Sequence, residues 1–229
     1  LVIACIWIAG CGGGGGGNNN TVNTAKIITG TAAAGAPIVG YVSVTDSSAN
    51  LQPVLKGIPI EANGHYSVDV AGLTPPYAFL ADGTIGGKRV TLYSAATADD
   101  EGKTINITPF TDLIVRNIAA TAVDAYLAGG GMANLTTAQL DSQRVALTAK
   151  LAPALIAMGV DSSIDLLRAT FNADSTGLDR FMDAVKVDTT NPGAVTITNI
   201  MDAASALIID TTASSTSLVS SGSVSTTNL

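Results

Sequence analysis

The sequence is poor in charged residues, aromatic residues and cysteine. Charged residues make up 13% of its 229 positions and aromatic residues 4%, whereas 47% are hydrophobic, so a core would be built mainly from Ala, Val, Ile and Leu. That hydrophobic content is too high for an intrinsically disordered chain. The 11 basic residues are outnumbered by 18 acidic ones and are scattered along the chain, which argues against a nucleic-acid partner.

The first ten residues are typical of a signal peptide. Residues 1–9 form an apolar run that is much shorter than the ~20 residues that a membrane-spanning helix needs. Ala9 and Gly10 supply the small side chains found at a signal-peptidase site. No Met or basic residue precedes the run, so we expect residues 1–10 to be a signal peptide that is truncated at its start.

Residues 8–11, Ile-Ala-Gly-Cys, resemble the lipobox of bacterial lipoproteins. The resemblance implies that Cys11 is the site of lipid attachment, and that two or three acyl chains hold the protein on a membrane. It also implies a destination, because Gly12 stands where an Asp would retain a lipoprotein in the inner membrane. The implied location is therefore the bacterial cell envelope, anchored by lipid at the outer membrane. The alternative is an ordinary cleaved signal, or a buried apolar N-terminal segment, with a chance cysteine.

The segment that follows Cys11 predicts a tether. Six glycines at 12–17 and three asparagines at 18–20 follow Cys11 in the segment 11–24, and a glycine chain has neither a preferred direction nor a side chain to bury. Cys5 lies in the segment expected to be removed, and Cys11 would carry lipid. No thiol would then remain for a disulfide, a zinc site or nucleophilic catalysis.

Residues 25–108 show the alternating pattern of β-strands. Alternation is complete over residues 65–70 and partial over 38–46. Asn63-Gly64, which follows residues 58–61, predicts a two-residue type I′ hairpin turn. Further expected strands are residues 77–81, 89–95 and 104–107, with turns at 82–83, 86–87 and 99–102. Several short strands separated by turns predict an antiparallel β-sandwich.

Part of this stretch resembles a known domain. The residues concerned are Gly30-Thr31-Ala32, residues 35–44 and residues 63–73, where Gly, Pro and alternating Val precede a Gly-x-Tyr-Ser strand. They are similar to the carboxypeptidase-regulatory-like, transthyretin-like β-sandwich of bacterial envelope proteins. Domains of that family are usually accessory modules, so the resemblance implies no enzymatic activity.

Residues 109–210 are predicted to form a helical unit with a C-terminal hairpin. Thr108-Pro109 is typical of a helix start, and apolar residues then recur at spacings of three and four as far as Tyr126. A second helix is expected from Thr136, capped with Gln139, to Met158 with a kink at Pro153. The remaining predicted elements are short helices at 163–170 and 177–185, a hairpin of 184–188 and 194–199 around a turn at 191–193, and a strand at 206–210.

The Ser/Thr-rich residues 211–229 are predicted to be a flexible tail. The expected fold class is therefore α+β, an N-terminal antiparallel β-sandwich followed by a small helical unit that ends in a β-hairpin. Residues 92–96, 107–115 and 177–197 also resemble uncharacterised envelope lipoproteins in which a sandwich precedes a helical unit. That resemblance brings no activity with it.

The candidates for chemistry are few. His65 is the only histidine and follows the predicted turn, which favours an exposed polar residue over a triad or a metal site. Asp161 and Asp165 would share a helix face if both were helical, but Asp161 is better placed to cap a helix start. We therefore assign no catalytic residue, no metal ligand and no cofactor from the sequence.

Residues 172–183 follow the spacing of a calcium-binding loop. Asn172, Asp174 and Thr176 stand at positions one, three and five, a glycine at six and Asp183 at twelve. The first residue is an amide, and the last is shorter than the bidentate Glu that calcium prefers. The alternative interpretation is that Thr176 and Asp179 cap a helix, so calcium binding at residues 172–183 stays open.

Two functions are consistent with this sequence. The first is a lipid-anchored, non-enzymatic envelope protein that binds a partner protein or glycan or acts as a structural module. The second is an envelope hydrolase, or its regulatory fragment, with chemistry from Asp, Ser and Thr side chains. A hydrolase predicts converging carboxylates with a raised pKa in a cleft, whereas a binding module predicts an exposed apolar or aromatic patch.

The anchor is tested by metabolic labelling with a palmitate analogue. The chain expressed from a completed signal is expected to take up the label, and Cys11→Ser is expected to take up none, because the thioether needs that sulfur. An unlabelled native chain would exclude lipid attachment at Cys11.

Overall fold

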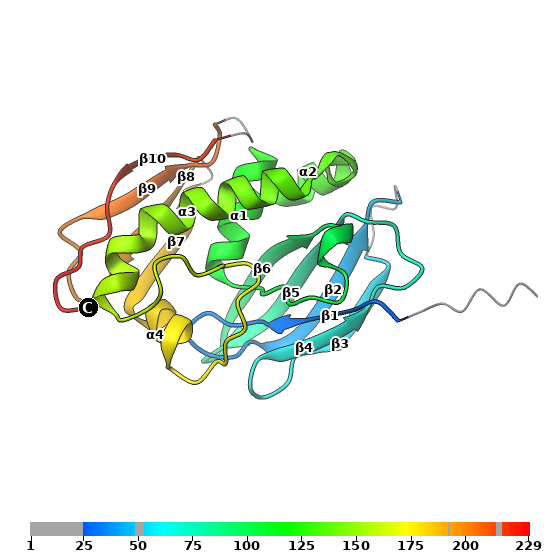
Figure 1. The fold of residues 1–229 in the computed structure, drawn as a ribbon, viewed down its shortest axis with the longest axis horizontal. Coiled ribbons are helices and arrows are strands. Elements are labelled where there is room, and N and C mark those ends of the chain that lie inside the picture. Colours follow the sequence, from blue (N-terminus) through cyan, green and yellow to red (C-terminus); the bar gives the residue numbers. More distant parts are fainter. Residues whose placement is uncertain (1–24, 49–52, 192, 214–216) are drawn as a thin grey trace, which may run out of the picture.

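The computed structural model describes residues 25–48, 53–191, 193–213 and 217–229. The predicted signal peptide at 1–10, the whole segment 11–24 with Cys11 and the tether, and Pro192 of the predicted turn lie outside the described residues. The fold is α+β, with an antiparallel β-sandwich, a small helical unit and a C-terminal hairpin that is part of a larger sheet (Figure 1). The predicted fold class is confirmed.

Two β-layers form the sandwich. Its strands are β1 (Ile27–Thr31), β2 (Val39–Asp46), β3 (Leu55–Pro59), β4 (His65–Asp69), β5 (Tyr77–Ile85) and β6 (Lys88–Ala96). One antiparallel sheet has the order β3-β2-β5-β6, and β1 pairs with β4 in the other layer. The layers meet through Tyr66 of β4 and Phe79 of β5, whose ring centroids lie 6.1 Å apart. Burial of alternating Val, Ile and aromatic side chains from both layers stabilises this contact.

The structure corrects two sequence predictions in the sandwich. Residues 82–83 are not a turn, because β5 continues through them and both residues pair with β2 and with β6. Residues 104–107 do not form a strand of their own. They run parallel to β1 instead, joined by isolated bridges at Thr29 and Ala32. The turn at 86–87 between β5 and β6 is confirmed.

The turn at Asn63-Gly64 is present but differs from the predicted type. Gly64 has φ of 86° and Asn63 is not among the residues with positive φ, so the loop is not type I′. Gly64 N donates to Glu61 O at 2.8 Å, and Glu61 N donates to His65 O at 2.8 Å. That pattern matches a three-residue loop with a glycine bulge, and it carries the chain from β3 in one layer to β4 in the other.

The helices are α1 (Pro109–Ala119), α2 (Val123–Ala128), α3 (Thr137–Ala157) and α4 (Gly177–Ala184), with short 3₁₀ turns η1 (Ala98–Asp100) and η2 (Gly131–Asn134). The predicted caps are confirmed for two of them. Thr108 accepts from Thr111 N at 3.3 Å at the start of α1. Thr136 and Gln139 exchange the two hydrogen bonds of a capping box at the start of α3.

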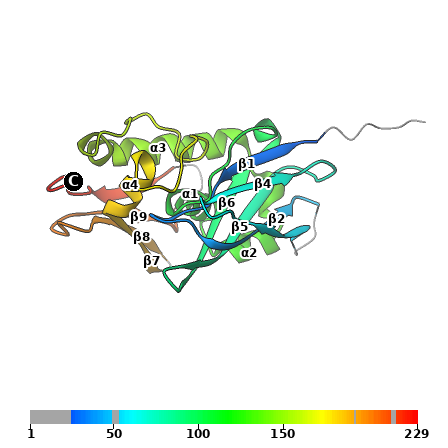
Figure 2. The ribbon, with the colours of Figure 1, turned by 90° about the horizontal axis from the view of Figure 1, so that it is seen from below.

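The first predicted helix is two helices. Ala120 has φ of 50°, a left-handed conformation that ends α1, and α2 begins three residues later. In α2, Val123 is buried and Asp124 accepts a hydrogen bond from Tyr93 of β6. The break therefore lets α2 turn back toward the sandwich sheet, on the face opposite β1–β4 (Figure 2).

The predicted helix at 163–170 is not formed. Asp165 accepts from the backbone N of Leu167 and of Arg168, both at 2.9 Å, so the segment folds as turns. Its carbonyl groups bond elsewhere, because Asn106 N donates to Leu167 O and Asn106 Nδ2 donates to Ala169 O. Non-local hydrogen bonds thus replace those that a helix would have made.

The chain ends in a second sheet, with the order β10-β9-β8-β7. Its strands are β7 (Val185–Asn191), β8 (Ala194–Asn199), β9 (Ala206–Asp210) and β10 (Val219–Gly222). The predicted hairpin and third strand are confirmed, but the prediction of a flexible tail is wrong for the described residues. There β10 pairs with β9, Val224 is 5% exposed, and Asn199 Nδ2 donates to the carbonyls of Ser225 and Thr227.

One hydrophobic core runs through both halves of the molecule. Phe110 of α1 stacks on Phe181 of α4 with centroids 5.6 Å apart, and Asn117 of α1 donates to Gln143 of α3. Within the described ranges, none of the helices has the length and apolar character that crossing a membrane requires.

A buried ion pair is expected to stabilise this arrangement. Arg168 Nε lies 2.6 Å from Asp100 Oδ1, and Asp100 is only 1% exposed. Arg168→Ala should lower the free energy of unfolding by about 3 kcal/mol, because it leaves a buried carboxylate without its cation. Arg89→Ala is the matched control, since its pair with Asp82 is exposed and worth at most about 1 kcal/mol. Equal losses in urea unfolding of the two variants would contradict this assignment.

Candidate functional site

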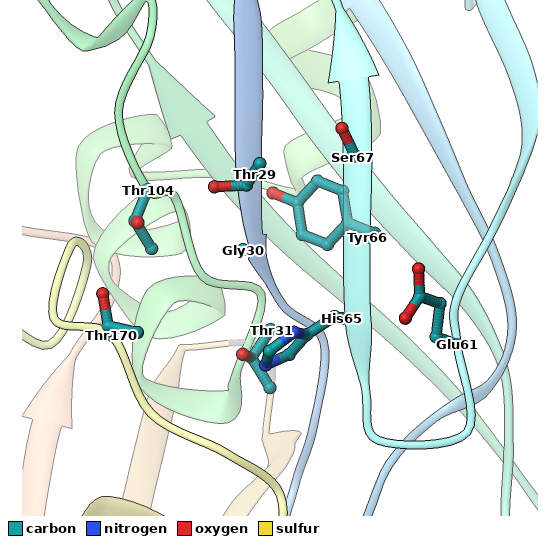
Figure 3. A pocket seen from close by; sticks show the side chains of 9 residues that line it. All are labelled: Thr29, Gly30, Thr31, Glu61, His65, Tyr66, Ser67, Thr104 and Thr170. Carbon is teal, nitrogen blue, oxygen red and sulfur yellow. The ribbon is translucent and has the colours of Figure 1, made fainter.

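A polar pocket lies on the outer face of the β1–β4 layer (Figure 3). Its volume is about 240 Å³. Its lining is Thr29, Gly30, Thr31, Glu61, His65, Tyr66, Ser67, Thr104 and Thr170. These residues come from β1, β4, the β3–β4 loop, the segment 104–107 beside β1, and Thr170 in the helical half, so both halves of the molecule build the pocket.

Strand register aligns three hydroxyl groups across this face. Thr29 pairs with Ser67 on one side and bridges in parallel to Thr104 on the other. Neighbouring strands lie about 4.8 Å apart, so Thr104, Thr29 and Ser67 form a row, here called the hydroxyl row. Among the described residues, none of these three hydroxyls has a hydrogen-bond partner within the chain. The row therefore offers its donors and acceptors to a ligand or to water.

A close contact of β1 with residues 104–107 forms the floor of the pocket. Gly30 is needed there, because a Cβ atom would lie 1.8 Å from Ile105 O. The hydroxyl of Tyr66 donates to the same Ile105 O at 2.6 Å. Burial raises the pKa of Tyr66, so this phenol remains a hydrogen-bond donor across the physiological range. Tyr66 and Gly30 thus hold the floor of the pocket in place, and a ligand would be bound by the other lining residues.

Thr31 lines the pocket, and its polar groups are bound to Phe171 and to Asn106 behind the lining. Thr31 Oγ1 donates to Phe171 O at 2.8 Å, and Thr31 N donates to Asn106 Oδ1 at 3.2 Å. Both residues are buried. The hydrogen bonds of Thr31 and Asn106 therefore connect the sandwich to residues 165–171. This connection also holds Thr170 at the rim of the pocket.

His65 lies in this pocket, half-buried rather than exposed as the sequence predicted. It pairs across the ladder with Thr31, and Figure 3 shows its ring beside that threonine. Sequence reasoning also missed the hydroxyl row. Its signal was present in part, because Thr29-x-Thr31 and His65-x-Ser67 each place two polar residues on one face of a strand. The contribution of Thr104 depends on a parallel contact with no sequence signature.

Asp161 and Asp165 do not form a carboxylate pair. Asp161 Oδ1 accepts from the backbone N and the hydroxyl of Ser163, both at 2.8 Å, and the first of these bonds lowers its pKa. The prediction that Asp161 caps a helix is wrong, because no helix begins there and the carboxylate closes a turn instead. Asp165 binds the amides of the next turn and lies 3.3 Å from Arg144. Both carboxylates are structural.

Residues 172–183 do not wrap around a central point as a calcium loop does. Helix α4 begins at Gly177, the sixth position of the pattern, so the later positions are helical. Asp174 accepts from Thr176 N at 3.1 Å, and Asp179 Oδ2 accepts from Ser175 N at 2.8 Å. In the part of the chain that the structure describes, no three His, Cys, Asp or Glu residues are grouped to hold a metal ion. The arrangement favours the start of a helix at Thr176.

Two buried carboxylates have a raised pKa, and neither lines the pocket of the hydroxyl row. Burial raises the pKa of Asp112. Its Oδ2 nevertheless lies 2.5 Å from Arg116 Nε, and its Oδ1 accepts a hydrogen bond from Tyr93 N. Burial also raises the pKa of Asp179, reinforced by the nearby Asp183 and Asp174. No polar partner among the described residues reaches Asp179 Oδ1.

Comparison with known proteins gives no relative, since no family model, no curated protein and no solved structure matches the chain.

The raised pKa of Asp179 predicts a pH-dependent cost to stability. The folded state holds this proton more tightly than the unfolded state, so stability falls as the pH rises from the unfolded pKa through the folded one. Asp179→Asn should therefore raise the melting temperature at pH 7 and have progressively less effect toward pH 3. Asp210→Asn is the control of opposite sign, because the hydrogen bond from Thr212 lowers the pKa of Asp210. A destabilised Asp179→Asn at pH 7 would contradict the assignment.

Proposed function

We propose that this chain is a lipid-anchored protein of the bacterial cell envelope, attached to the outer membrane through Cys11, that acts as a non-enzymatic binding module. Its ligand is a glycan, held at the hydroxyl row. The anchor is supported by the lipobox-like residues 8–11 and the glycine tether. The binding function is supported by the pocket itself.

The observation that carries the glycan proposal is the row of three hydroxyls without partners. Each hydroxyl donates one hydrogen bond and accepts others, as the hydroxyls of a sugar do. Each hydroxyl of the row can therefore act as donor or as acceptor toward a sugar hydroxyl. Thr170 adds a further exposed hydroxyl at the rim. The ionisable groups at the pocket are Glu61, His65 and Tyr66, without Lys or Arg, which favours a neutral ligand over a phosphate.

A hydrolase is the second candidate, and one observation favours it. The single histidine of the chain lies in the same pocket as Glu61 and Ser67, which are residue types used as base, acid and nucleophile. If the pocket were catalytic, His65→Ala would abolish turnover of a bound glycan. A binding module would release the glycan unchanged, and His65→Ala would alter the affinity alone.

The glycan proposal is tested by titrating the chain with a panel of neutral oligosaccharides. Thr29→Val and Thr104→Val keep the side-chain shape and remove one hydroxyl each, so each should weaken the binding of a responding sugar by about fivefold. Thr84→Val on β5 is the matched control, because Thr84 lies outside the pocket. Binding that is unchanged in both pocket variants, or absent for every oligosaccharide, would contradict the proposal.

A further inference from the structure

Helix α2 covers the face of the sandwich sheet that is opposite β1 and β4 (Figure 2). A second cavity is lined by residues of α2 and of this sheet face. Its volume is about 240 Å³. Its lining is Thr45, Pro53, Ala78, Leu80, Tyr93, Asp124, Leu127 and Ala128. Strand register explains why the sheet residues share this face, since Thr45 pairs with Ala78 and Leu80 pairs with Tyr93.

A hydrogen bond between Tyr93 and Asp124 spans the cavity wall. The hydroxyl of Tyr93 on β6 donates to Asp124 Oδ1 on α2, which fixes the first turn of the helix to the sheet. Small side chains, Ala78 and Ala128, line the space. Because Asp124 and Ala128 are exposed, the cavity opens to solvent and a ligand can enter it.

The polar group at the rim is a carboxylate without a cation. Asp124 is exposed, and no ion pair between described residues includes it. Arg116 acts electrostatically on the neighbouring Tyr93, but it is engaged with Asp112 at 2.5 Å. Burial and the hydrogen bond to Asp124 raise the pKa of Tyr93, so the phenol stays neutral. The carboxylate of Asp124 is therefore the group of the cavity that attracts a cation.

From the apolar walls and this carboxylate, we infer that the cavity binds a small apolar amine, with its hydrophobic part between Leu80 and Leu127 and its ammonium group at Asp124. The size fits one ring and a short side chain, because an apolar cavity of about 150 Å³ is enough to hold benzene. Fatty acids and other carboxylates are disfavoured by repulsion from Asp124. This site is separate from the hydroxyl row and does not depend on the proposed function.

The test is an NMR titration of the full chain with three probes of similar shape and different charge, 2-phenylethylammonium, 2-phenylethanol and phenylacetate. The methyl signals of Ala78, Leu80 and Leu127 are expected to shift and saturate with the ammonium probe. The alcohol should bind about fivefold more weakly and phenylacetate more weakly still, since one ion pair at an exposed rim is worth about 1 kcal/mol.

Two variants with matched controls complete the test. Asp124→Asn should lower the affinity for the ammonium probe to that for the alcohol. Asp82→Asn removes a carboxylate from the same sheet outside the cavity, and it should leave the difference in affinity between these two probes unchanged. Ala128→Leu should narrow the cavity and weaken all three probes, whereas Ala125→Leu at an exposed position of α2 outside the lining should not. Thermal melts establish that each variant is folded. Equal binding of the three probes, no saturable shift, or full binding by Ala128→Leu would overturn the inference.

Discussion

Asn106 makes the hydrogen bonds on which the rest of the structure depends. Its side chain accepts from Thr31 N in the sandwich and donates to Ala169 O in the helical half, while its backbone N donates to Leu167 O. The residue is fully buried, so each unmet bond would cost about 1–3 kcal/mol. Because all three are made, residues 104–107 are fixed along β1 and the two halves share one core.

Both proposed binding sites follow from the way the helical half packs on the sandwich. On one face, residues 104–107 and Thr170 extend the β1–β4 layer and complete the hydroxyl row. On the opposite face, the left-handed Ala120 sends α2 back over the sheet, and the Tyr93–Asp124 bond holds it there above a cavity. One site is therefore polar and uncharged along its row of hydroxyls, and the other is apolar with a single carboxylate.

Several local features of this fold were predictable from the sequence, although the turn type at Asn63-Gly64 and the break at Ala120 were not. The features that depend on distant contacts could not be predicted. Alternation placed β2 and β4, and the Thr136–Gln139 pair placed the start of α3, because these signals act within a few residues. The helix expected at 163–170 failed because Asn106, some 60 residues away, bonds its carbonyls. The ordered end of the chain was missed for the same reason, since Ser/Thr composition does not reveal pairing of β10 with β9. His65 was found as a candidate, but Thr104 became one only through its parallel contact with β1.

Amide hydrogen exchange in Asn106→Ala, compared with the native chain, tests whether Asn106 links the two halves. Protection should fall together at Phe79 in the sandwich and at Leu147 in α3, because loss of the shared hydrogen bonds weakens one cooperative unit. Loss of protection in one half, with the other half exchanging as in the native chain, would contradict this role of Asn106.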